Sequence, residues 1–325
     1  MTVPAVATRP KLGFAGIGWI GRSRLEAIAA SGAAEVAALA DPVGSDLDVD
    51  CLDSFEELLE RDLDGVVIAT PSALHAKQAV MALDRGLAVF CQKPLGRDAS
   101  ETRAVVEAAR RADRLLGVDL SYRYTRAAQA LRDEVRSGAL GEVYAVDLVF
   151  HNAYGPDKPW FYDRRLAGGG CLIDLGIHLA DLALWALDFP PAEVLSGRLL
   201  SPRGLAVEEV AFAELNLGGA HVRLACSWRL PAGRDCVIEA SFHGTDGAVS
   251  LHNVDGSFYD LRAERRRGTK AEELAAAAGD DWGGRAAVEW ARRLAAGGRY
   301  DAGIEPLIDV AHLLDAVYRE ARCES

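Results

Sequence analysis

The stretch that decides the fold is Lys11-Leu12-Gly13-Phe14-Ala15-Gly16-Ile17-Gly18-Trp19-Ile20-Gly21. It begins with a short apolar run, and apolar residues recur at helical spacing after the glycines. A strand, a tight glycine turn and a helix in this order are the context of a dinucleotide-binding fingerprint. The glycines let pyrophosphate oxygens reach backbone N–H groups at the positive end of the helix. The expected contacts with a dinucleotide are Gly16, Gly18, Trp19, Ile20 and Gly21.

A second strand strengthens this fingerprint, which alone has low specificity. Residues 36–40 read as a strand that ends at Asp41, twenty positions beyond Gly21. A carboxylate there can accept both ribose hydroxyls of an adenosine and repels a 2′-phosphate, and residues 42–45 contain no arginine to hold one. The sequence therefore favours NAD and disfavours NADP. The alternative is that Asp41 is a turn residue before Pro42.

Strand and helix signals then alternate as far as residue 120. Apolar runs predict strands at 65–69, 87–91 and 115–120, and helical periodicity covers 74–83 and 100–112. This pattern predicts an N-terminal doubly wound parallel sheet, whose ligands bind off the carboxyl ends of the strands. The candidate contacts that follow those ends are Thr70, Pro71, His75, Gln92, Lys93, Tyr122 and Arg123.

Two of these candidates have plainer alternatives. Lys93 directly follows a buried strand, where it can donate to a substrate oxygen, but its side chain can also extend along the surface to reach solvent. His75 can contact a cofactor or can be a histidine of a helix start or of the surface.

The pattern changes after Gly141. Strands are expected at 142–150, 207–217, 221–230, 236–242 and 248–252, separated by glycine-rich turns without helices, and helices at 282–296 and 306–321. We therefore expect two domains, a Rossmann domain at 1–121 and, at 122–325, an α+β domain with an open-faced, mostly antiparallel sheet. The open face favours self-association as a homodimer or homotetramer.

Inside this second half, residues 168–185 read GGGCLIDLGIHLADLALW and predict a helix that is apolar on nearly all sides. At about 100° per residue, Asp174, His178, Asp181 and Trp185 share a stripe roughly 60° wide. A buried carboxylate and imidazole one turn apart favour a polar site, because an unpaired buried charge is costly. The alternative is an amphipathic helix whose polar stripe faces water.

A loop of aromatic and basic residues precedes the glycine run. Such residues can stack on a sugar ring and bind hydroxyl or carboxylate oxygens, although an exposed loop held by aromatic anchors is an equally good interpretation. The candidate substrate contacts in this loop are Tyr154, Trp160, Arg164 and Arg165.

Composition excludes several classes of protein. The 36 basic and 48 acidic residues give a net charge of −12, which argues against a nucleic-acid partner, and the basic cluster at 262–267 is expected to be a solvated strand end or turn. The six cysteines lack metal-ligand spacing, so we expect reduced thiols and no metal site. The longest apolar run is interrupted by His178 and Asp181, and no signal core is found, so we expect a cytoplasmic protein without a membrane partner.

Five segments together resemble the Gfo/Idh/MocA family of nicotinamide-dependent oxidoreductases, in the family's order. They are GFAGIGWIG (13–21), ALADP (38–42), ATPSALHA (69–76), QKPLG (92–96) and GGGCLIDLGIHLADL (168–182). The resemblance implies a Rossmann domain joined to an open-faced α/β domain with catalysis between them. It also implies that Lys93 contacts nicotinamide and substrate while Asp174 and His178 handle the reacting hydroxyl. The sequence departs from the family at Gln92, where a glutamate is usual.

The leading hypothesis is reversible NAD-dependent oxidation of a secondary alcohol on a sugar, cyclitol or related polyol, with Lys93, Asp174 and His178 as catalytic residues. His178 would take the hydroxyl proton, Asp174 would orient it and Lys93 would stabilise the alkoxide. Two alternatives stay open. One is a lyase or glycosidase that works by transient oxidation, and the other is a nicotinamide-binding sensor without catalysis.

Overall fold

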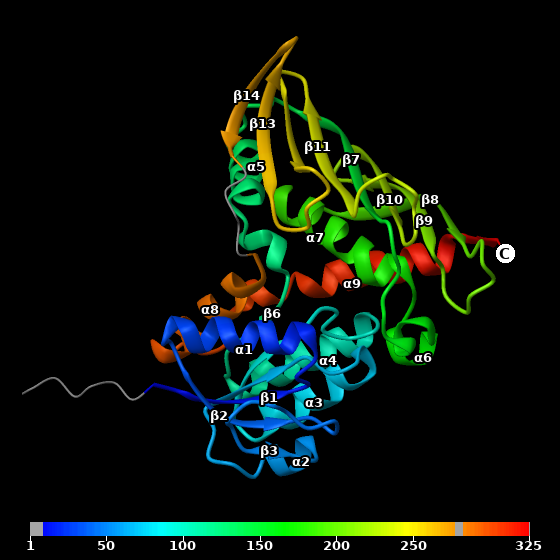
Figure 1. Ribbon diagram of the computed structural model, residues 1–325. Coiled ribbons are helices and arrows are strands. Elements are labelled where there is room, and N and C mark those ends of the chain that lie inside the picture. Colours follow the sequence, from blue (N-terminus) through cyan, green and yellow to red (C-terminus); the bar gives the residue numbers. More distant parts are fainter. Residues whose placement is uncertain (1–8, 277–281, 325) are drawn as a thin grey trace, which may run out of the picture. The chain divides into compact units, whose positions relative to one another are not determined.

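The computed structural model describes residues 9–276 and 282–324 (Figure 1). The chain divides into two compact units. The N-terminal unit consists of the residues up to Gly96, Ser100–Ser121 and Gly283–Glu305, and the C-terminal unit of Arg97–Ala99, Tyr122–Trp282 and the residues from Pro306 onward.

The N-terminal unit contains a six-stranded parallel sheet in the order β3-β2-β1-β4-β5-β6. This is the strand order of a dinucleotide-binding Rossmann fold, so the predicted doubly wound sheet is confirmed. The strands are β1 (Lys11–Ala15), β2 (Glu35–Ala40), β3 (Cys51–Leu52), β4 (Gly65–Ile68), β5 (Ala88–Cys91) and β6 (Leu116–Val118). Strands β4 and β5 are buried throughout, as their unbroken apolar sequences predict.

Helices cover this sheet, with α1 on β1 and β2 and α3 on β4 and β5. The helices of the unit are α1 (Trp19–Ser31), α2 (Phe55–Leu58), α3 (Ser72–Asp84), α4 (Ala99–Ala112), α8 (Trp282–Ala295) and the short 3₁₀ helix η4 (Ala302–Ile304). Helix α8 corrects the predicted domain division, which gave all residues after 121 to the second domain. Trp290 packs on Phe90 of β5 at a ring distance of 5.6 Å, so its apolar face is buried in the N-terminal unit.

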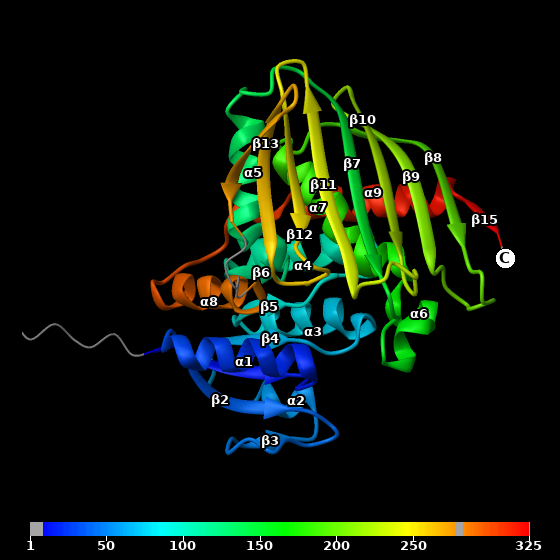
Figure 2. The ribbon, with the colours of Figure 1, turned by 45° about the horizontal axis from the view of Figure 1, so that its top comes forward.

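The C-terminal unit contains a nine-stranded sheet in the order β14-β13-β12-β11-β7-β10-β9-β8-β15 (Figure 2). Its pairs are antiparallel except β10 with β7 and β15 with β8. The strands are β7 (Val143–Asn152), β8 (Ala192–Leu200), β9 (Val210–Leu217), β10 (Ala220–Ser227), β11 (Cys236–Gly244), β12 (Ala248–Asn253), β13 (Leu261–Arg267), β14 (Lys270–Ala275) and β15 (Arg322–Glu324). The predicted mostly antiparallel sheet is therefore confirmed.

One face of this sheet carries the helical layer, seen behind the strands in Figure 2. The helices are η1 (Ser121–Tyr124), α5 (Arg126–Arg136), η2 (Pro159–Tyr162), α6 (Arg164–Ala167), η3 (Leu172–Gly176), α7 (Ile177–Ala186) and α9 (Leu307–Glu320). Alternate residues of the strands, such as Val146, Leu148 and Phe150 in β7, point into the core between sheet and helices. The opposite face exposes Tyr144 and Phe212.

Within the described residues, one helical stretch, Arg164–Ala186, is long and apolar enough by composition to cross a membrane, and 78% of its apolar window is buried inside the fold. Burial on this scale is what a core helix of a folded unit shows. The basic cluster at 262–267 lies in β13, where Arg265 pairs with Glu134 at 2.5 Å and Arg266 pairs with Glu264 at 3.5 Å.

Candidate functional site

The glycine turn of the N-terminal unit is built as the fingerprint requires. Gly16 has φ +83°, and a Cβ there would lie 2.6 Å from the carbonyl oxygen of Ala69. A Cβ on Gly21 would collide with the Gly16 carbonyl. A Cβ on Gly18, in contrast, would meet no heavy atom within 4 Å, so the space beside Gly18 is open. Gly18 caps α1 without any side-chain hydrogen bond, and the first turn holds no acidic residue. The first N–H groups of α1 therefore donate no hydrogen bond to a capping side chain. Such N–H groups can bind a phosphate.

Asp41 lies at the end of β2, beside this turn. Its Oδ2 accepts the Ile17 N–H at 2.7 Å, and its Oδ1 accepts the Val43 N–H at 2.9 Å. These bonds fix a carboxylate next to the glycine turn and leave each oxygen a further lone pair. The arginine on the first turn of α1, Arg22, pairs with Glu26 at 2.9 Å and with Asp46 at 2.7 Å. Both the carboxylate of Asp41 and the paired guanidinium of Arg22 therefore lie beside the glycine turn.

His75 lies in the interior and is 1% exposed. Its Nδ1 and Nε2 each lie 2.7 Å from a carbonyl oxygen, of Pro94 and Thr70 respectively. Burial lowers the pKa of the imidazole, and the two carbonyls oppose that shift. Both ring nitrogens of His75 therefore bind the backbone, and the predicted contact with the cofactor stays a prediction. The role of His75 is to tie together the loops that follow β4 and β5.

Those two loops carry the other candidates of this edge. Thr70 donates its hydroxyl to the side-chain oxygen of Gln78 at 2.6 Å, and Pro71 precedes α3. Lys93 is half-buried and is joined to Pro94 by a cis peptide bond. Gln92 is 7% exposed and donates its amide to Asp119, a residue that the sequence analysis did not single out.

In the C-terminal unit, the three glycines pack against the protein itself. Side chains on Gly169 and Gly170 would collide with the Tyr318 hydroxyl and the Glu208 carbonyl. Glu208 Oε1 accepts the N–H groups of Gly170 at 2.9 Å and Leu172 at 3.0 Å. The absence of side chains at these glycines therefore allows the close approach of Tyr318 and Glu208 to the backbone.

Glu208 and Tyr318 form a buried pair behind this helix start. The Tyr318 hydroxyl donates to Glu208 Oε1 at 2.8 Å and accepts the Ile173 N–H at 3.2 Å. Burial raises the pKa of Glu208 above its usual range, although the bonds from Tyr318, Leu172 and Gly170 oppose the shift. Burial also raises the pKa of the Tyr318 hydroxyl. Together, Glu208 and Tyr318 hold the backbone N–H groups at the start of η3.

The turn η3 is a π-helix, which continues into α7. The predicted helix is confirmed, with buried side chains on most of its surface and with Asp174, His178 and Trp185 half-buried. The insertion of a π turn is common at functional sites. Asp174 lies inside this turn, and its Oδ2 accepts the indole N–H of Trp228 at 3.0 Å.

The ring of His178 lies among aromatic side chains of the same unit. Its centroid is 5.0 Å from that of Tyr122, edge to face, and 6.2 Å from that of Phe150. Tyr122, a predicted substrate contact, is 8% exposed and also packs on Phe150 at 6.0 Å. These contacts hold the imidazole in one orientation on the half-buried stripe of the helix.

Arg123, the other candidate of this segment, is an internal contact. Its Nε donates to Asp181 Oδ2 at 2.8 Å, a second nitrogen binds Asp181 Oδ1, and its guanidinium stacks over the rings of Trp185 and Phe189. Burial raises the pKa of Asp181, and Arg123 opposes the shift. The guanidinium of Arg123 therefore holds α7 through Asp181, and its predicted contact with substrate stays a prediction.

The predicted loop divides into anchored and exposed residues. Trp160 stacks on Phe161 at 3.8 Å, and Tyr154 is 51% exposed. Arg164 lies over the Tyr318 ring at 5.4 Å, whereas Arg165 pairs with its neighbour Asp163 at 3.0 Å and stays exposed. Arg229, in a left-handed conformation with φ 58°, donates to the Tyr162 hydroxyl at 3.2 Å.

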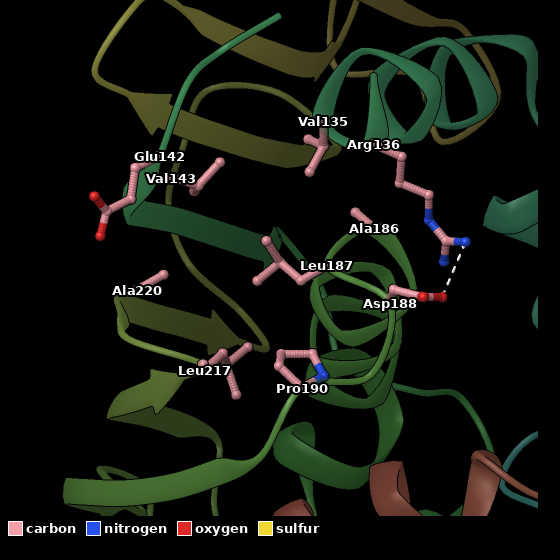
Figure 3. A pocket seen from close by; sticks show the side chains of 11 residues that line it. Val135, Arg136, Glu142, Val143, Ala186, Leu187, Asp188, Pro190, Leu217 and Ala220 are labelled. Carbon is pink, nitrogen blue, oxygen red and sulfur yellow. Dashed lines mark ion pairs between the residues drawn. The ribbon is translucent and has the colours of Figure 1, made fainter. Parts of the chain in front are cut away.

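A cavity of about 470 Å³ lies elsewhere in the C-terminal unit (Figure 3). An ion pair between Arg136 and Asp188 at 3.0 Å stands at its rim, and apolar residues such as Leu187 and Leu217 line it. None of the predicted site residues lines this cavity. Within the ranges 9–276 and 282–324, no group of three His, Cys, Asp or Glu side chains is placed to hold a metal ion.

Two descriptions of protein families match the chain, one in each unit. The "Oxidoreductase family, NAD-binding Rossmann fold" matches residues 11–120, and the "GFO/IDH/MocA C-terminal domain" matches residues 128–250. Among curated relatives, the rhizopine catabolism protein MocA of Rhizobium meliloti is 34% identical over 185 residues, 55% of this chain and 57% of the relative. The 1,5-anhydro-D-fructose reductase of Ensifer adhaerens is 36% identical over 207 residues, 62% of this chain and 61% of the relative.

The matched region thus spans about three fifths of each of these relatives. Among solved structures, KijD10, a 3-ketoreductase from Actinomadura kijaniata in complex with NADP and TDP-benzene, superposes with a TM-score of 0.85. It is 23% identical, and the match covers 97% of this chain and 99% of that one. At this identity the similarity shows the fold alone.

Proposed function

The chain belongs to the Gfo/Idh/MocA family of oxidoreductases, and on that premise we propose that it interconverts a secondary alcohol and a ketone on a sugar, cyclitol or related polyol. The observation that supports this most strongly is the half-buried pair Asp174 and His178, set by a π turn on a helix that is otherwise buried. An acid and an imidazole one turn apart are the groups that moving a hydroxyl proton requires.

The glycine turn fits a dinucleotide, because the open space at Gly18 and the uncapped N–H groups of α1 suit a pyrophosphate. The fixed carboxylate of Asp41 suits a ribose diol and opposes a 2′-phosphate, so we propose NAD as the cofactor. Arg22 is a nearby cation, and its pairs with Glu26 and Asp46 partly neutralise it, so it attracts a 2′-phosphate less than an unpaired arginine would. A bound nicotinamide supplies the acceptor for the hydride that leaves the carbinol carbon.

The chain's own residues manage the proton. His178 takes the hydroxyl proton as the carbon–oxygen double bond forms and passes it to solvent, and in the reverse direction it returns one. Asp174, oriented by the Trp228 indole, holds the hydroxyl or the imidazole in place. Lys93 stabilises the negative charge that develops on the substrate oxygen, because its ammonium group is a compact, positively charged hydrogen-bond donor.

A sugar or polyol suits the aromatic loop before the glycine run. The stacked rings of Trp160 and Phe161 offer an apolar surface of the kind on which sugar rings pack, and the exposed Arg165 offers hydrogen-bond donors. The name of the Ensifer relative, a reductase of a sugar ketone, supports the same substrate class.

We also propose that the chain self-associates as a homodimer or homotetramer through the open face of its nine-stranded sheet. Tyr144 is 56% exposed and Phe212 44% exposed on that face, and exposed large apolar side chains favour burial against a second copy. Light scattering during gel filtration tests this proposal. A monomer that persists at high protein concentration would contradict it.

The experiment that tests the function is a spectrophotometric screen of purified protein with NAD and NADP against a panel of sugars, cyclitols and aminosugars. Accumulation of reduced cofactor that depends on substrate supports a dehydrogenase. Product formed without net reduced cofactor would favour the transient-oxidation lyase or glycosidase instead. Cofactor binding without turnover across the panel would favour a sensor.

A further inference from the structure

A buried polar cluster lies at the carboxyl ends of β5 and β6, in the N-terminal unit. It combines Arg24 of α1, Gln92 after β5, Asp119 after β6 and Ser121. The four residues are 2%, 7%, 2% and 3% exposed in that order. Groups so deeply buried must satisfy one another, because water does not reach them.

Asp119 is the centre of this cluster. Its Oδ2 accepts Arg24 Nε at 2.5 Å and also the side-chain amide of Gln92, while its Oδ1 accepts the Ser121 hydroxyl. Arg24 Nη2 donates in turn to the Ser121 hydroxyl at 3.3 Å. One carboxylate therefore faces one guanidinium, and the two formal charges cancel.

This arrangement fixes which end of the Gln92 amide faces inward. A carboxylate oxygen paired with arginine accepts hydrogen bonds and donates none, so the amide nitrogen must point at Asp119. The amide oxygen then faces away from Asp119 and remains an acceptor. A glutamate at position 92 would place a second carboxylate against Asp119, with Arg24 as the guanidinium shared by both.

The location gives this amide oxygen a partner of defined chemistry. In a Rossmann fold the first half of the sheet binds the adenosine half of the dinucleotide, and the second half binds the nicotinamide half at the strand ends. Gln92 directly follows β5, in that second half. An acceptor there suits an amide or hydroxyl donor of the nicotinamide nucleotide.

We propose that Gln92 and Asp119 work as one unit, in which buried Asp119 is a positioning residue that holds the negative charge and Gln92 presents a neutral acceptor to the nicotinamide half of the cofactor. This inference rests on the proposed function. Oxidised nicotinamide carries a positive charge and reduced nicotinamide does not, so a neutral acceptor discriminates between them less than the family's glutamate does. The Gln92/Asp119 unit thus sets the relative affinity for the two oxidation states.

The test is a charge exchange on the full chain, with Q92E, D119N and the double variant Q92E/D119N. Q92E brings two carboxylates together and D119N leaves Arg24 without its counter-charge, so each single variant should lower the unfolding midpoint. The double variant restores one carboxylate for one guanidinium and should recover most of the loss. If the unfolding midpoint of the double variant falls by as much as the two single losses added together, the proposed pairing of Gln92 and Asp119 is wrong.

The second measurement is the dissociation constants of NAD⁺ and NADH, by titration of the wild type and the double variant. Moving the carboxylate to position 92 should shift the ratio toward NAD⁺ by about tenfold, an order of magnitude typical of charges several ångströms apart near a protein surface. An unchanged ratio would show that position 92 does not face the cofactor. The control is Q129E, which adds the same charge at an exposed residue of α5 and should change neither quantity.

These measurements distinguish a failure of the proposed function from a failure of the role proposed for Gln92. If the wild type binds neither NAD⁺ nor NADH, the proposed function fails, and the stability cycle still decides whether Gln92 and Asp119 are paired. If the cofactor binds but the ratio does not move, the function stands and the role of Gln92 is refuted.

Discussion

The indole N–H of Trp228 donates to Oδ2 of Asp174 across 3.0 Å. Trp228 directly follows β10, and Asp174 lies in the π turn η3 that precedes α7. Trp228 is 2% exposed and packs edge to face on Tyr162 at 5.7 Å. A donor held so firmly fixes the orientation of the Asp174 carboxylate.

We therefore expect W228F to lower kcat about tenfold while the dissociation constant of NAD stays within about twofold, because the variant loses only the orientation of Asp174. Steady-state kinetics and a cofactor titration check this. The matched control is W290F, because the indole N–H of Trp290 is buried without a hydrogen-bond partner among the described residues. If both variants lose the same activity, packing and not the hydrogen bond is responsible.

Glu208 gives a prediction about pH. Burial raises its pKa in the folded chain above the ordinary 4.5, so the stability it contributes is fully present below pH 4.5 and is lost as the pH rises through the folded value. E208Q keeps an acceptor oxygen and has no charge. Its free energy of unfolding relative to the wild type should therefore improve steadily from acid to neutral pH.

Urea unfolding at several pH values measures that difference. E193Q, at an exposed position of β8, serves as control for the loss of a carboxylate and should show a smaller change with pH than E208Q. A difference for E208Q that changes with pH no more than that for E193Q would contradict the buried-carboxylate account of the helix start.

Asp41 gives a prediction about cofactor choice. D41A removes the acceptor for the ribose hydroxyls and the repulsion of a 2′-phosphate, so NAD should bind about tenfold more weakly and the preference for NAD over NADP should shrink. Titrations with both cofactors check it. D48A removes an exposed carboxylate of the same loop and should leave the preference unchanged. A preference retained by D41A would show that other groups select the cofactor.

Much of the fold was predictable because its signals are local. The apolar run at 11–15, the glycine turn and the strand before Asp41 specify β1, α1 and β2 through neighbouring residues. The strands β8 and β14 were not predicted, since β8 mixes polar and small residues and β14 is largely exposed. Such strands are held by pairing with neighbours, which periodicity does not report.

Helix α8 shows a different limit. Its sequence predicted a helix, and 282–295 is one, but Trp290 of this helix packs on Phe90 of β5, 200 positions earlier in the chain. A contact of that sequence separation leaves no local trace, so the helix was given to the wrong unit.

The candidate site divides in the same way. Asp174 and His178 were recognisable because they stand out on an apolar helix, whereas Trp228, Glu208 and Asp119 carry no motif and acquire their meaning from distant partners. Arg123 and His75 were proposed as ligand contacts because they follow the carboxyl ends of predicted strands. Their partners proved to be Asp181 and two backbone carbonyls of the chain itself.

The central claim is that His178 moves the proton of the reacting hydroxyl. The most direct test is the turnover number of H178A with the best substrate of the polyol panel, measured beside its dissociation constant for NAD. We predict a fall of about a hundredfold or more in turnover with nearly unchanged cofactor affinity, because general acid–base catalysis contributes that much and the imidazole lies outside the glycine turn. Turnover equal to the wild type would contradict the account.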